Sequence, residues 1–441
     1  MTHRGQENTH TKILCISNIA RSSHTYKFTS LASMLNEQYL KECFSELKAH
    51  KAAGVDNVSI DCYREKLDEN IKDLHHRLKT NAYHPQPVRR VYIPKLNGEM
   101  RPLGIPALED KIVQQGITKI LTAIYEPAFR KMSYGFRKGR NCHQAIQDLD
   151  RTTWAKPIHY VIDADIKGFF DNVDHAWMLK FLAHRIADKN LLRIITRIVK
   201  SGIMDEGKYF ETDKGTPQGG ILSPVLSNIY LHYVLDLWVD IVLRKELKGF
   251  VRAIRYCDDF IICLENKDEA EAVLVKLEER LNTFGLELSK EKTRLIRFGK
   301  NAQQNRASKP DTFDFLGFTF YCGKTQTGGF KLGKKTSRKK LNAKLKALNE
   351  WFRKIRNVLP LPAIWKTLNQ KLTGHYQYYG VSGNLLTISQ YYHHTKRLAF
   401  KWLNRRSQRK SFNWDTFLLY ESRYPLAKPK IYHDLYNRAG A

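Results

Sequence analysis

The sequence lacks paired cysteines and long apolar runs. Its seven cysteines are odd in number and scattered, so neither a zinc ribbon nor a disulfide framework is expected, and reduced thiols are the default. The most apolar helical segment, 230–243, is interrupted by Asp236 and Asp240 and falls short of the roughly 20 apolar residues that a membrane span requires. The apolar run 13–16 is too short for a secretion signal. We therefore expect a cytoplasmic protein with no membrane partner.

Acidic residues are scarce relative to basic ones. There are 44 Asp and Glu against 74 Lys and Arg, a formal charge of +30, while 42% of residues are hydrophobic, as in a folded protein. Residues 331–441 hold 24 Lys and Arg but only 4 Asp and Glu, a balance of +20. Aromatic residues interleave with these cations, which suits nucleic acid because bases stack on rings and cations neutralise phosphates. The same aromatic residues would equally form the core of a helical domain.

The length of 441 residues exceeds what one hydrophobic core fills, so two or more subdomains are expected. Segment 299–305 carries no apolar period, and segment 323–340 is basic and rich in glycine, so both are candidate boundaries. Beyond them, apolar spacing predicts helices over about 341–355, 363–378 and 386–406. The last quarter of the chain therefore reads as a basic helical bundle.

Two pairs of aspartates stand out. A buried-strand pattern over 160–166 carries Asp163 and Asp165, and Asp258-Asp259 falls between β-type runs at 251–256 and 260–264. Aspartate at a hairpin turn is ordinary, so the second pair alone would be structural. If Asp165 faces Asp258 and Asp259, however, the three carboxylates offer hard oxygen ligands to two Mg²⁺ ions about 4 Å apart, the arrangement used for in-line phosphoryl transfer.

Three motifs occur in an order that identifies a family. They are Asp-Ile-Lys-Gly-Phe-Phe-Asp at 165–171, Gly-Thr-Pro-Gln-Gly-Gly at 215–220 and Tyr-Cys-Asp-Asp at 256–259. Together they resemble the palm motifs of reverse transcriptases, in particular the reverse transcriptase/maturase proteins encoded by group II introns. Further matches lie at 54–56, 93–95, 101–106, 133–137, 288–293 and 315–318, so the resemblance spans about 28–435.

The resemblance implies an α+β chain with the right-hand polymerase fold. It implies an N-terminal extension over 1–35, reverse transcriptase fingers and palm over 36–325, and a basic α-helical thumb or maturase (X) domain over 326–441. The chain shows no cysteine-paired endonuclease module, and so resembles the endonuclease-lacking branch. Two residues depart from the family pattern: Cys257 stands where Ala is common, and Asn57 where Gly is usual. We expect polymerase activity to survive with Cys257, which is small enough for a hairpin packed beside the primer, and the fold to tolerate Asn57, since Asn readily adopts a left-handed turn.

The resemblance also assigns metal ligands and catalytic residues. Asp165, Asp258 and Asp259, with the backbone carbonyl of Ile166, would hold two Mg²⁺ ions, for which Mn²⁺ would substitute. Asp163 is the rival of Asp165. Asp165 is preferred because Phe170 then falls five positions on, where family polymerases place an aromatic gate that crowds a ribose 2′-hydroxyl and favours dNTPs. Phe170 would otherwise be a core residue.

Other residues are predicted to contact the incoming dNTP. Lys95 and Arg101 match family residues that contact the triphosphate, which requires cationic donors, although the Asn97-Gly98 dipeptide also marks an ordinary hairpin turn. Gln218 resembles the residue that lines the nucleotide pocket. The helix after this loop is expected to have Ser223 as its N-cap. Lys292 is a candidate proton donor to pyrophosphate, with Lys290 as its competitor.

The function implied by the resemblance is RNA-directed DNA polymerisation, in which dNTPs extend a DNA primer on an RNA template. Binding of intron RNA for splicing, and retrohoming into a target DNA, are expected with it. Three alternatives stay open at this point: a non-enzymatic maturase, an RNA-dependent RNA polymerase, and a domesticated reverse transcriptase that serves DNA repair or phage defence.

Overall fold

The computed structural model describes residues 9–48, 51–94, 98–304, 310–406 and 412–436. The chain mixes helices and sheets, as expected, and divides into two compact units. Unit 1 comprises 1–141, 164–260 and 271–294, and unit 2 comprises 142–163, 261–270 and 295–441. All predicted catalytic and dNTP-contacting residues belong to unit 1, whereas the basic helical region belongs to unit 2.

In unit 1, several helices pack around a buried one. That helix, α5 (Leu108–Tyr125), is almost wholly buried, and α1 (Thr9–Ser22) and α2 (Glu37–Ser45) pack against it. The side chain of Asn36 caps α2 by accepting from the Tyr39 amide. The other helices here are α3 (Ile60–Glu65), α4 (Leu67–Lys79), α7 (Phe169–Asn172), α8 (His175–Ala183) and α9 (Lys189–Val199).

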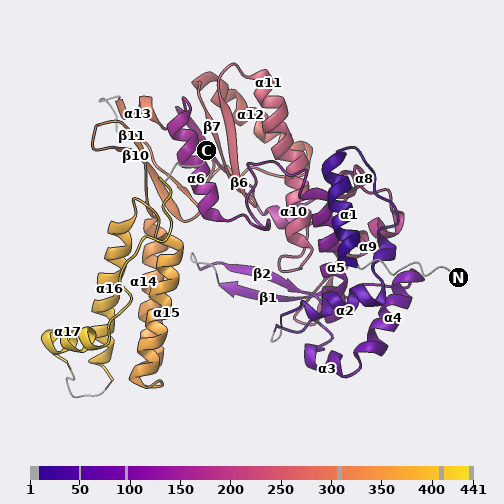
Figure 1. Cartoon of the computed structure of the whole chain (residues 1–441), viewed down its shortest axis with the longest axis horizontal. Helices are drawn as coiled ribbons and strands as arrows, with labels where there is room; N and C mark the ends of the chain where they lie inside the picture. Colours follow the sequence, from indigo (N-terminus) through magenta and orange to yellow (C-terminus); the bar gives the residue numbers. More distant parts are fainter. Residues whose placement is uncertain (1–8, 49–50, 95–97, 305–309, 407–411, 437–441) are drawn as a thin grey trace. The chain divides into compact units, whose positions relative to one another are not determined.

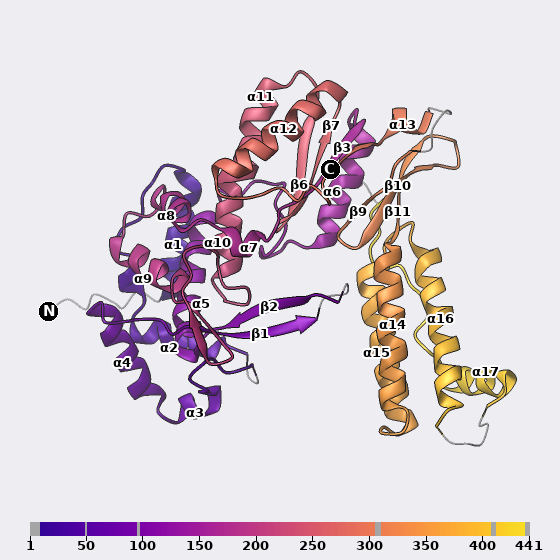
Figure 2. The same cartoon turned by 180° about the vertical axis from the view of Figure 1, so that it is seen from behind.

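A long hairpin leaves this helical body (Figures 1 and 2). Strands β1 (Val88–Pro94) and β2 (Met100–Ile105) pair antiparallel, with Ile93 opposite Arg101. Strands β4 (Ile203–Asp205) and β5 (Lys208–Phe210) extend the sheet in the order β2-β1-β4-β5. The predicted hairpin is therefore confirmed, although Lys95 and Asn97 at its turn lie outside the described residues.

A second sheet carries the aspartate motifs. Its order is β6-β7-β3-β8, formed by β6 (Val251–Tyr256), β7 (Asp259–Leu264), β3 (Tyr160–Asp165) and β8 (Arg294–Arg297). The structure confirms the predicted hairpin to within one residue, because β6 and β7 are neighbours joined by Cys257 and Asp258 alone. Asp165 ends β3, so the first motif also lies at a strand end. Helix α12 (Lys267–Thr283) follows β7.

One long apolar helical stretch runs from Ser223 to Glu246. By length and composition it could cross a membrane, but 72% of its apolar window is buried inside the protein, as in a core helix. It comprises α10 (Ser223–Leu231), two π-helical segments, His232–Asp236 and Trp238–Leu243, and α11 (Arg244–Glu246). The two aspartates that interrupt the apolar run are both ion-paired, Asp236 to Arg255 and Asp240 to Arg130 and Arg244.

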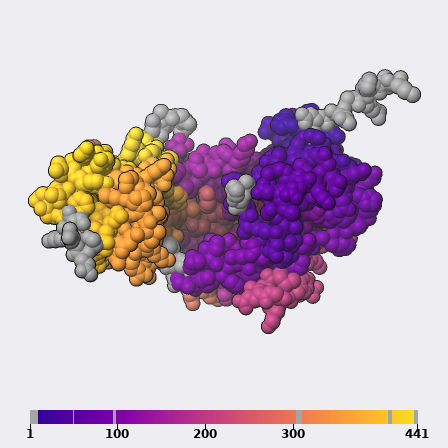
Figure 3. Space-filling view, turned by 90° about the horizontal axis from the view of Figure 1, so that it is seen from below, coloured from indigo at the N-terminus to yellow at the C-terminus, as the bar shows by residue number. Residues whose placement is uncertain are grey.

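The predicted C-terminal helices are confirmed in unit 2. They are α14 (Arg338–Ile355), α15 (Leu361–Tyr379) and α16 (Leu385–Leu403), which lie side by side in Figures 1 and 2 and form one orange and yellow mass in Figure 3. A shorter helix, α17 (Trp414–Arg423), follows. Helix α6 (Cys142–Ala155) also belongs to this unit, with α13 (Lys300–Gln304).

The glycine-rich basic stretch 323–340 is not a linker. It forms most of a hairpin in which β10 (Phe318–Lys324) pairs antiparallel with β11 (Phe330–Thr336), beside β9 (Phe313–Phe315). The predicted boundary between 325 and 326 therefore falls inside one hairpin. Lys334, which contributes to the basic appearance of this stretch, is fully buried and ion-paired to Asp150, so its charge is not on a solvated face.

Candidate active site

The hairpin turn between β6 and β7 presents the Asp258-Asp259 pair. Cys257 occupies the turn with φ of 60°, a left-handed conformation that residues with a side chain seldom adopt. Its thiol is buried, and burial raises its pKa to about 12. Asp258 is half-buried at the tip, and Asp259 begins β7. The turn thus places two adjacent carboxylates at the end of the sheet.

Asp165 lies close enough to Asp258 to influence its titration. Burial raises the pKa of the Asp258 carboxyl, the negative charge of Asp165 raises it further, and the positive charge of Arg101 lowers it. These interactions bring together three predicted site residues from β3, the hairpin turn and β2. Asp165, the preferred one of the two rival aspartates of the strand, is thus electrostatically coupled to Asp258.

Lys292 forms an ion pair with the carboxylate of Asp165. The Nζ of Lys292 donates to Oδ2 of Asp165 at 2.7 Å, and this bond raises the pKa of Lys292. Its competitor Lys290 instead pairs with Glu278 at 3.0 Å. The structure therefore brings Lys292, and not Lys290, to the predicted site.

The donor set suits a divalent cation, but the full predicted cluster is not assembled. A half-buried carboxyl whose charged form is disfavoured by burial and by a neighbouring carboxylate would be stabilised by a cation, and Asp258 is such a group. However, over the part of the chain that the structure describes, no group of three or more Asp, Glu, His or Cys side chains could hold a metal ion. The three-carboxylate assignment therefore stays a prediction.

The backbone at Ile166 has the orientation expected of a ligand. Ile166 forms an antiparallel bridge with Leu288, and the bonds on either side are made by their neighbours, since Lys167 N donates to Glu287 O at 2.9 Å and Ser289 N to Asp165 O at 2.8 Å. Residues in such a non-hydrogen-bonded pair direct their own N–H and C=O groups away from that neighbour. Because β3 lies between β7 and β8, the Ile166 carbonyl is directed to the side of β7.

Two predicted dNTP contacts share one cavity in unit 1. Phe170 in α7 and Gln218 in the glycine-rich loop both line a hollow of about 260 Å³, together with Gly104 of β2. Phe170 is only half-buried, and its ring meets the buried ring of Phe169 edge to face at 5.3 Å. The core position is therefore taken by Phe169, which leaves Phe170 at the cavity wall. Arg90 and Lys214 also line this cavity, and the sequence motifs did not single them out.

Glycines allow the loop 215–220, which lines part of the cavity, to pass close to β2. Gly219 has φ of 111°, and a Cβ there would come within 2.8 Å of the Gly104 carbonyl oxygen. Gly104 N donates to Gln218 O at 2.6 Å, and Thr216 N donates to Phe170 O at 2.7 Å. These bonds tie the loop to β2 and α7, which fixes the two predicted contact residues relative to each other.

The prediction that Ser223 caps the next helix is wrong. Leu222 already has helical dihedral angles and is the N-cap, with no side-chain bond to the helix. The Ser223 hydroxyl instead donates to the Pro217 carbonyl at 2.7 Å and so fastens the loop. The tolerance expected for Asn57 is borne out, because Asn57 adopts φ of 54°.

The aromatic residues of the basic helical region are mainly core. Of the ten Phe, Trp and Tyr residues from Trp351 to Trp402, seven are buried: Phe352, Trp365, Tyr376, Tyr379, Tyr391, Tyr392 and Trp402. The cations are arranged differently. Burial lowers the pKa of Lys344 in α14, and the nearby charges of Lys371 and Lys340 lower it further. Lys344 thus lies close enough to two other ammonium groups for a local site of positive potential, which an anion would relieve.

Comparisons with known proteins identify the family of the chain. A family profile described as "Reverse transcriptase (RNA-dependent DNA polymerase)" matches residues 93–320, just over half of the chain. That match contains the three aspartates, Phe170 and Gln218.

Three curated relatives show how far the similarity extends. The chain is 34% identical over 270 residues to "Group II intron-encoded protein LtrA" of Lactococcus lactis, covering 59% of this chain and 45% of the relative. It is 33% identical over 278 residues to "Protein YkfC" of Escherichia coli, covering 56% and 73%. It is 28% identical over 307 residues to "Putative COX1/OXI3 intron 2 protein" of Saccharomyces cerevisiae, covering 68% and 32%. The chain thus spans less than half the length of LtrA, and it belongs to the reverse transcriptase family.

Proposed function

We propose that this chain is an RNA-directed DNA polymerase of the group II intron type, which extends a primer 3′-hydroxyl with dNTPs on an RNA template. The observations that carry the proposal are the cavity lined by Phe170, Gln218 and Gly104 and the coupled carboxylates Asp165 and Asp258 of the same unit. A pocket for a nucleotide and an acidic pair for metal ions are two parts that nucleotidyl transfer requires.

Asp165, Asp258, Asp259 and the Ile166 carbonyl would hold two Mg²⁺ ions, or Mn²⁺ in their place. When bound, these ions would activate the primer hydroxyl and neutralise charge on the leaving pyrophosphate. The acidic residues bring hard oxygen donors to the hairpin tip and the end of β3. Support for this comes from the raised pKa of Asp258, because a nearby cation would stabilise the charged form that burial and Asp165 disfavour.

The other site residues bind and select the nucleotide. Arg101, with Lys95 of the same hairpin, would donate to the triphosphate, and the Lys292 ammonium beside Asp165 holds a proton near the position of the leaving pyrophosphate. The half-buried ring of Phe170 would crowd a 2′-hydroxyl and exclude rNTPs. Gln218, fixed by its backbone bond to Gly104, would line the base and sugar pocket.

Residues 326–441 would act as thumb and maturase (X) domain. We propose that they grip the template–primer duplex and bind intron RNA for splicing, with target DNA as a further partner in retrohoming. The balance of +20 over 331–441 and the mutual repulsion at Lys344 support a polyanionic partner. A cytoplasmic location is part of the same proposal.

The test is the variant Asp258→Ala, assayed for extension of a DNA primer on an RNA template with dNTPs and Mg²⁺. We expect synthesis to disappear while RNA affinity stays within about twofold, because the carboxylates and the basic helices are separate sites. Extension by the variant at the wild-type rate would refute the assignment. Splicing support without any primer extension by the wild type would favour a non-enzymatic maturase, and preference for rNTPs would favour an RNA polymerase.

A further inference from the structure

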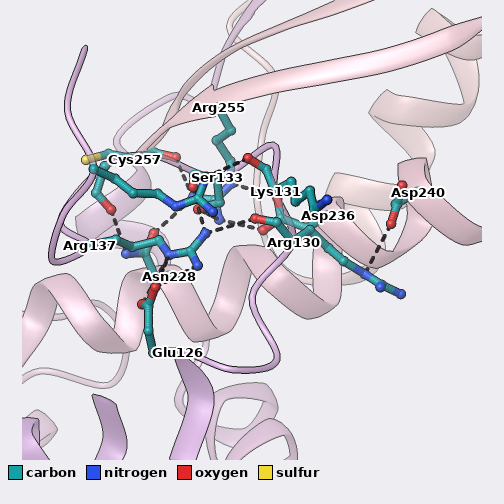
Figure 4. Close-up of polar contacts among 12 residues, drawn as sticks. Glu126, Arg130, Lys131, Ser133, Arg137, Asn228, Asp236, Asp240, Arg255 and Cys257 are labelled. Carbon is teal, nitrogen blue, oxygen red and sulfur yellow. Dashed lines mark hydrogen bonds and ion pairs between the residues drawn. The ribbon is translucent and has the colours of Figure 1, made fainter. Parts of the chain in front are cut away.

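A fully buried ion pair joins the hairpin that carries Asp258 and Asp259 to the π-helical segment His232–Asp236. The side chains of Arg255 and Asp236 both have 0% exposure. Nε of Arg255 donates to Oδ1 of Asp236 at 2.7 Å and Nη2 donates to Oδ2 at 2.6 Å, a bidentate pair visible in Figure 4. A buried ion pair adds little stability over apolar residues of the same volume. Its presence beside the site therefore calls for a role other than stability.

The remaining guanidinium hydrogens hold the hairpin turn and two other segments. Nη1 of Arg255 donates to the Cys257 carbonyl at 2.9 Å and to Oδ1 of Asn228 at 3.1 Å, and Nη2 donates to the Ser133 hydroxyl at 2.8 Å. All five N–H donors are thus used. The guanidinium connects β6, α10, the π-helical segment that contains Asp236, and the loop that contains Ser133 (Figure 4).

The hydrogen bond from Arg255 to the Cys257 carbonyl constrains a residue with an unfavourable backbone conformation. Cys257 is in the left-handed region at φ of 60°, a conformation that persists in such residues only where the surroundings enforce it. Its carbonyl belongs to the same rigid peptide unit as the Asp258 nitrogen. Holding that carbonyl therefore sets the direction in which the Asp258 side chain leaves the turn.

The loop under the turn is fitted to the same network. A Cβ on Gly135 would come within 2.5 Å of both N and Sγ of Cys257, so the loop touches the turn directly. Nδ2 of Asn228 donates to the Gly135 carbonyl at 2.8 Å, and Arg255 N donates to Met132 O at 2.8 Å. Asn228 therefore fixes both the guanidinium and the loop against which the turn packs.

We propose that Arg255, held by Asp236 and Asn228, is a positioning residue for the catalytic hairpin. It enforces the left-handed turn at Cys257 and thereby orients Asp258 and Asp259 for catalysis. The catalytic part of this role rests on the proposed polymerase function, whereas control of the turn does not. Arg255 binds the Cys257 carbonyl directly, and its own side chain is fully buried.

The buried thiol of Cys257 provides a direct test of the turn. Its exposure is 8%, and Cys43 in α2, with 0% exposure, serves as an internal reference in the same unit. Iodoacetamide labelling of the whole protein, with each cysteine quantified by mass spectrometry, reports local opening at both sites. Removing one buried hydrogen-bond partner should increase opening of the turn about tenfold.

Variants are chosen so that no buried charge is left alone. Ser133→Ala and Asn228→Ala each remove a partner of Arg255, and the double variant Arg255→Met with Asp236→Leu replaces both charges by apolar side chains. The matched control is Lys334→Met with Asp150→Leu, which removes another buried ion pair, in unit 2. We expect labelling of Cys257 to rise about tenfold in the first three variants, with Cys43 within twofold, and to stay at the wild-type level in the control.

Primer extension by the same variants separates positioning from packing. We expect kcat to fall on the order of 10- to 100-fold, since a displacement of 1 Å at reacting groups has that effect, while KM for dNTP stays within about twofold. Unchanged labelling of Cys257, labelling that rises equally at Cys43, or faster labelling with unchanged kcat would each overturn the proposal. If the wild type makes no DNA, the polymerase proposal fails, and the labelling result still decides whether Arg255 controls the turn.

Discussion

The ammonium of Lys292 lies 2.7 Å from a carboxylate oxygen of Asp165, so a cation of the chain itself occupies the first predicted metal ligand. The two side chains are separated by 127 positions in the sequence. Both are partly exposed, with side-chain exposures of 33% for Asp165 and 69% for Lys292. A divalent cation bound by Asp165 would have to compete with this ammonium for the same oxygen.

Replacing Lys292 by Gln should lower the Mg²⁺ concentration needed for half-maximal primer extension. An exposed ion pair contributes up to about 1 kcal/mol, so the midpoint should shift by up to about fivefold, and Mn²⁺ affinity measured by EPR without substrates should rise by the same factor. The control is Lys290→Gln, which breaks only the exposed pair with Glu278 and should leave the midpoint unchanged. A midpoint that rises in Lys292→Gln would show that the lysine assists metal binding.

Replacing Phe170 by Ala should relax selection against rNTPs. The ring lines the same cavity as Gln218 and is not needed as core, since Phe169 fills that position. We expect the ratio of kcat/KM for dNTP over rNTP to fall on the order of 10- to 100-fold, with the thermal midpoint of unfolding nearly unchanged. Phe170→Tyr, which keeps the ring, should keep most of the discrimination. An unchanged ratio in the alanine variant would remove the gate assignment.

Neutralising Lys340, Lys344 and Lys371 together should weaken RNA binding in a salt-dependent way. Each cation that neutralises one phosphate contributes about 0.7 to 0.9 to the slope of log K against log salt. The triple Gln variant should therefore lose about two units of slope, measured by filter binding from 50 to 300 mM salt. Lys66→Gln, Lys72→Gln and Lys79→Gln together, all exposed in unit 1, match the charge change. Equal losses in both variants would indicate that net charge alone binds RNA.

Local sequence patterns predicted the parts of the fold that depend on neighbours in the chain. The hairpin around Cys257 and the three C-terminal helices could be predicted because turn chemistry and apolar spacing are local signals. The hairpin over 318–336 was missed, because its charges suggested a solvated segment whereas Lys334 is neutralised by Asp150, 184 positions away. Similarly, Asp236 seemed only to interrupt an apolar helix, since its partner Arg255 is recognised only in the folded chain.

At the candidate site too, sequence motifs identified some residues, whereas others could be assigned only from the folded structure. Motif order assigned Phe170 and Gln218, and the structure places both at one cavity. Motif order could not assign Arg90 and Lys214 to that cavity. Arg90 lies in a strand without a distinctive motif, and Lys214 lies just outside the motif at 215–220. The choice between Lys290 and Lys292 also required the fold, since both lie in the same short segment and only one reaches Asp165.

The helical region should lose stability below neutral pH through His375. This side chain of α15 is buried, its ring stacks on Tyr391 of α16 at 3.9 Å, and neither ring nitrogen has a hydrogen-bond partner among the described residues. Burial, and to a lesser degree the charge of Lys344, lowers its pKa to about 3. As the pH falls through about 6.5, the unfolded chain takes up a proton that the folded chain accepts only near pH 3. Stability contributed by the neutral ring is therefore lost progressively across that window, by about 2 kcal/mol between pH 7 and pH 5.

His375→Phe should keep the stacked ring and remove this dependence. The difference in unfolding free energy between variant and wild type, measured by urea titration at pH 7, 6 and 5, should grow by about 2 kcal/mol in favour of the variant. His394→Phe changes an exposed histidine on α16 and should follow the wild-type profile. Because other buried groups, such as His232, titrate in the same range, the test lies in this difference and not in either profile alone. A difference that stays constant with pH would mean that the pKa of His375 is the same in the folded and the unfolded chain, and would contradict this prediction.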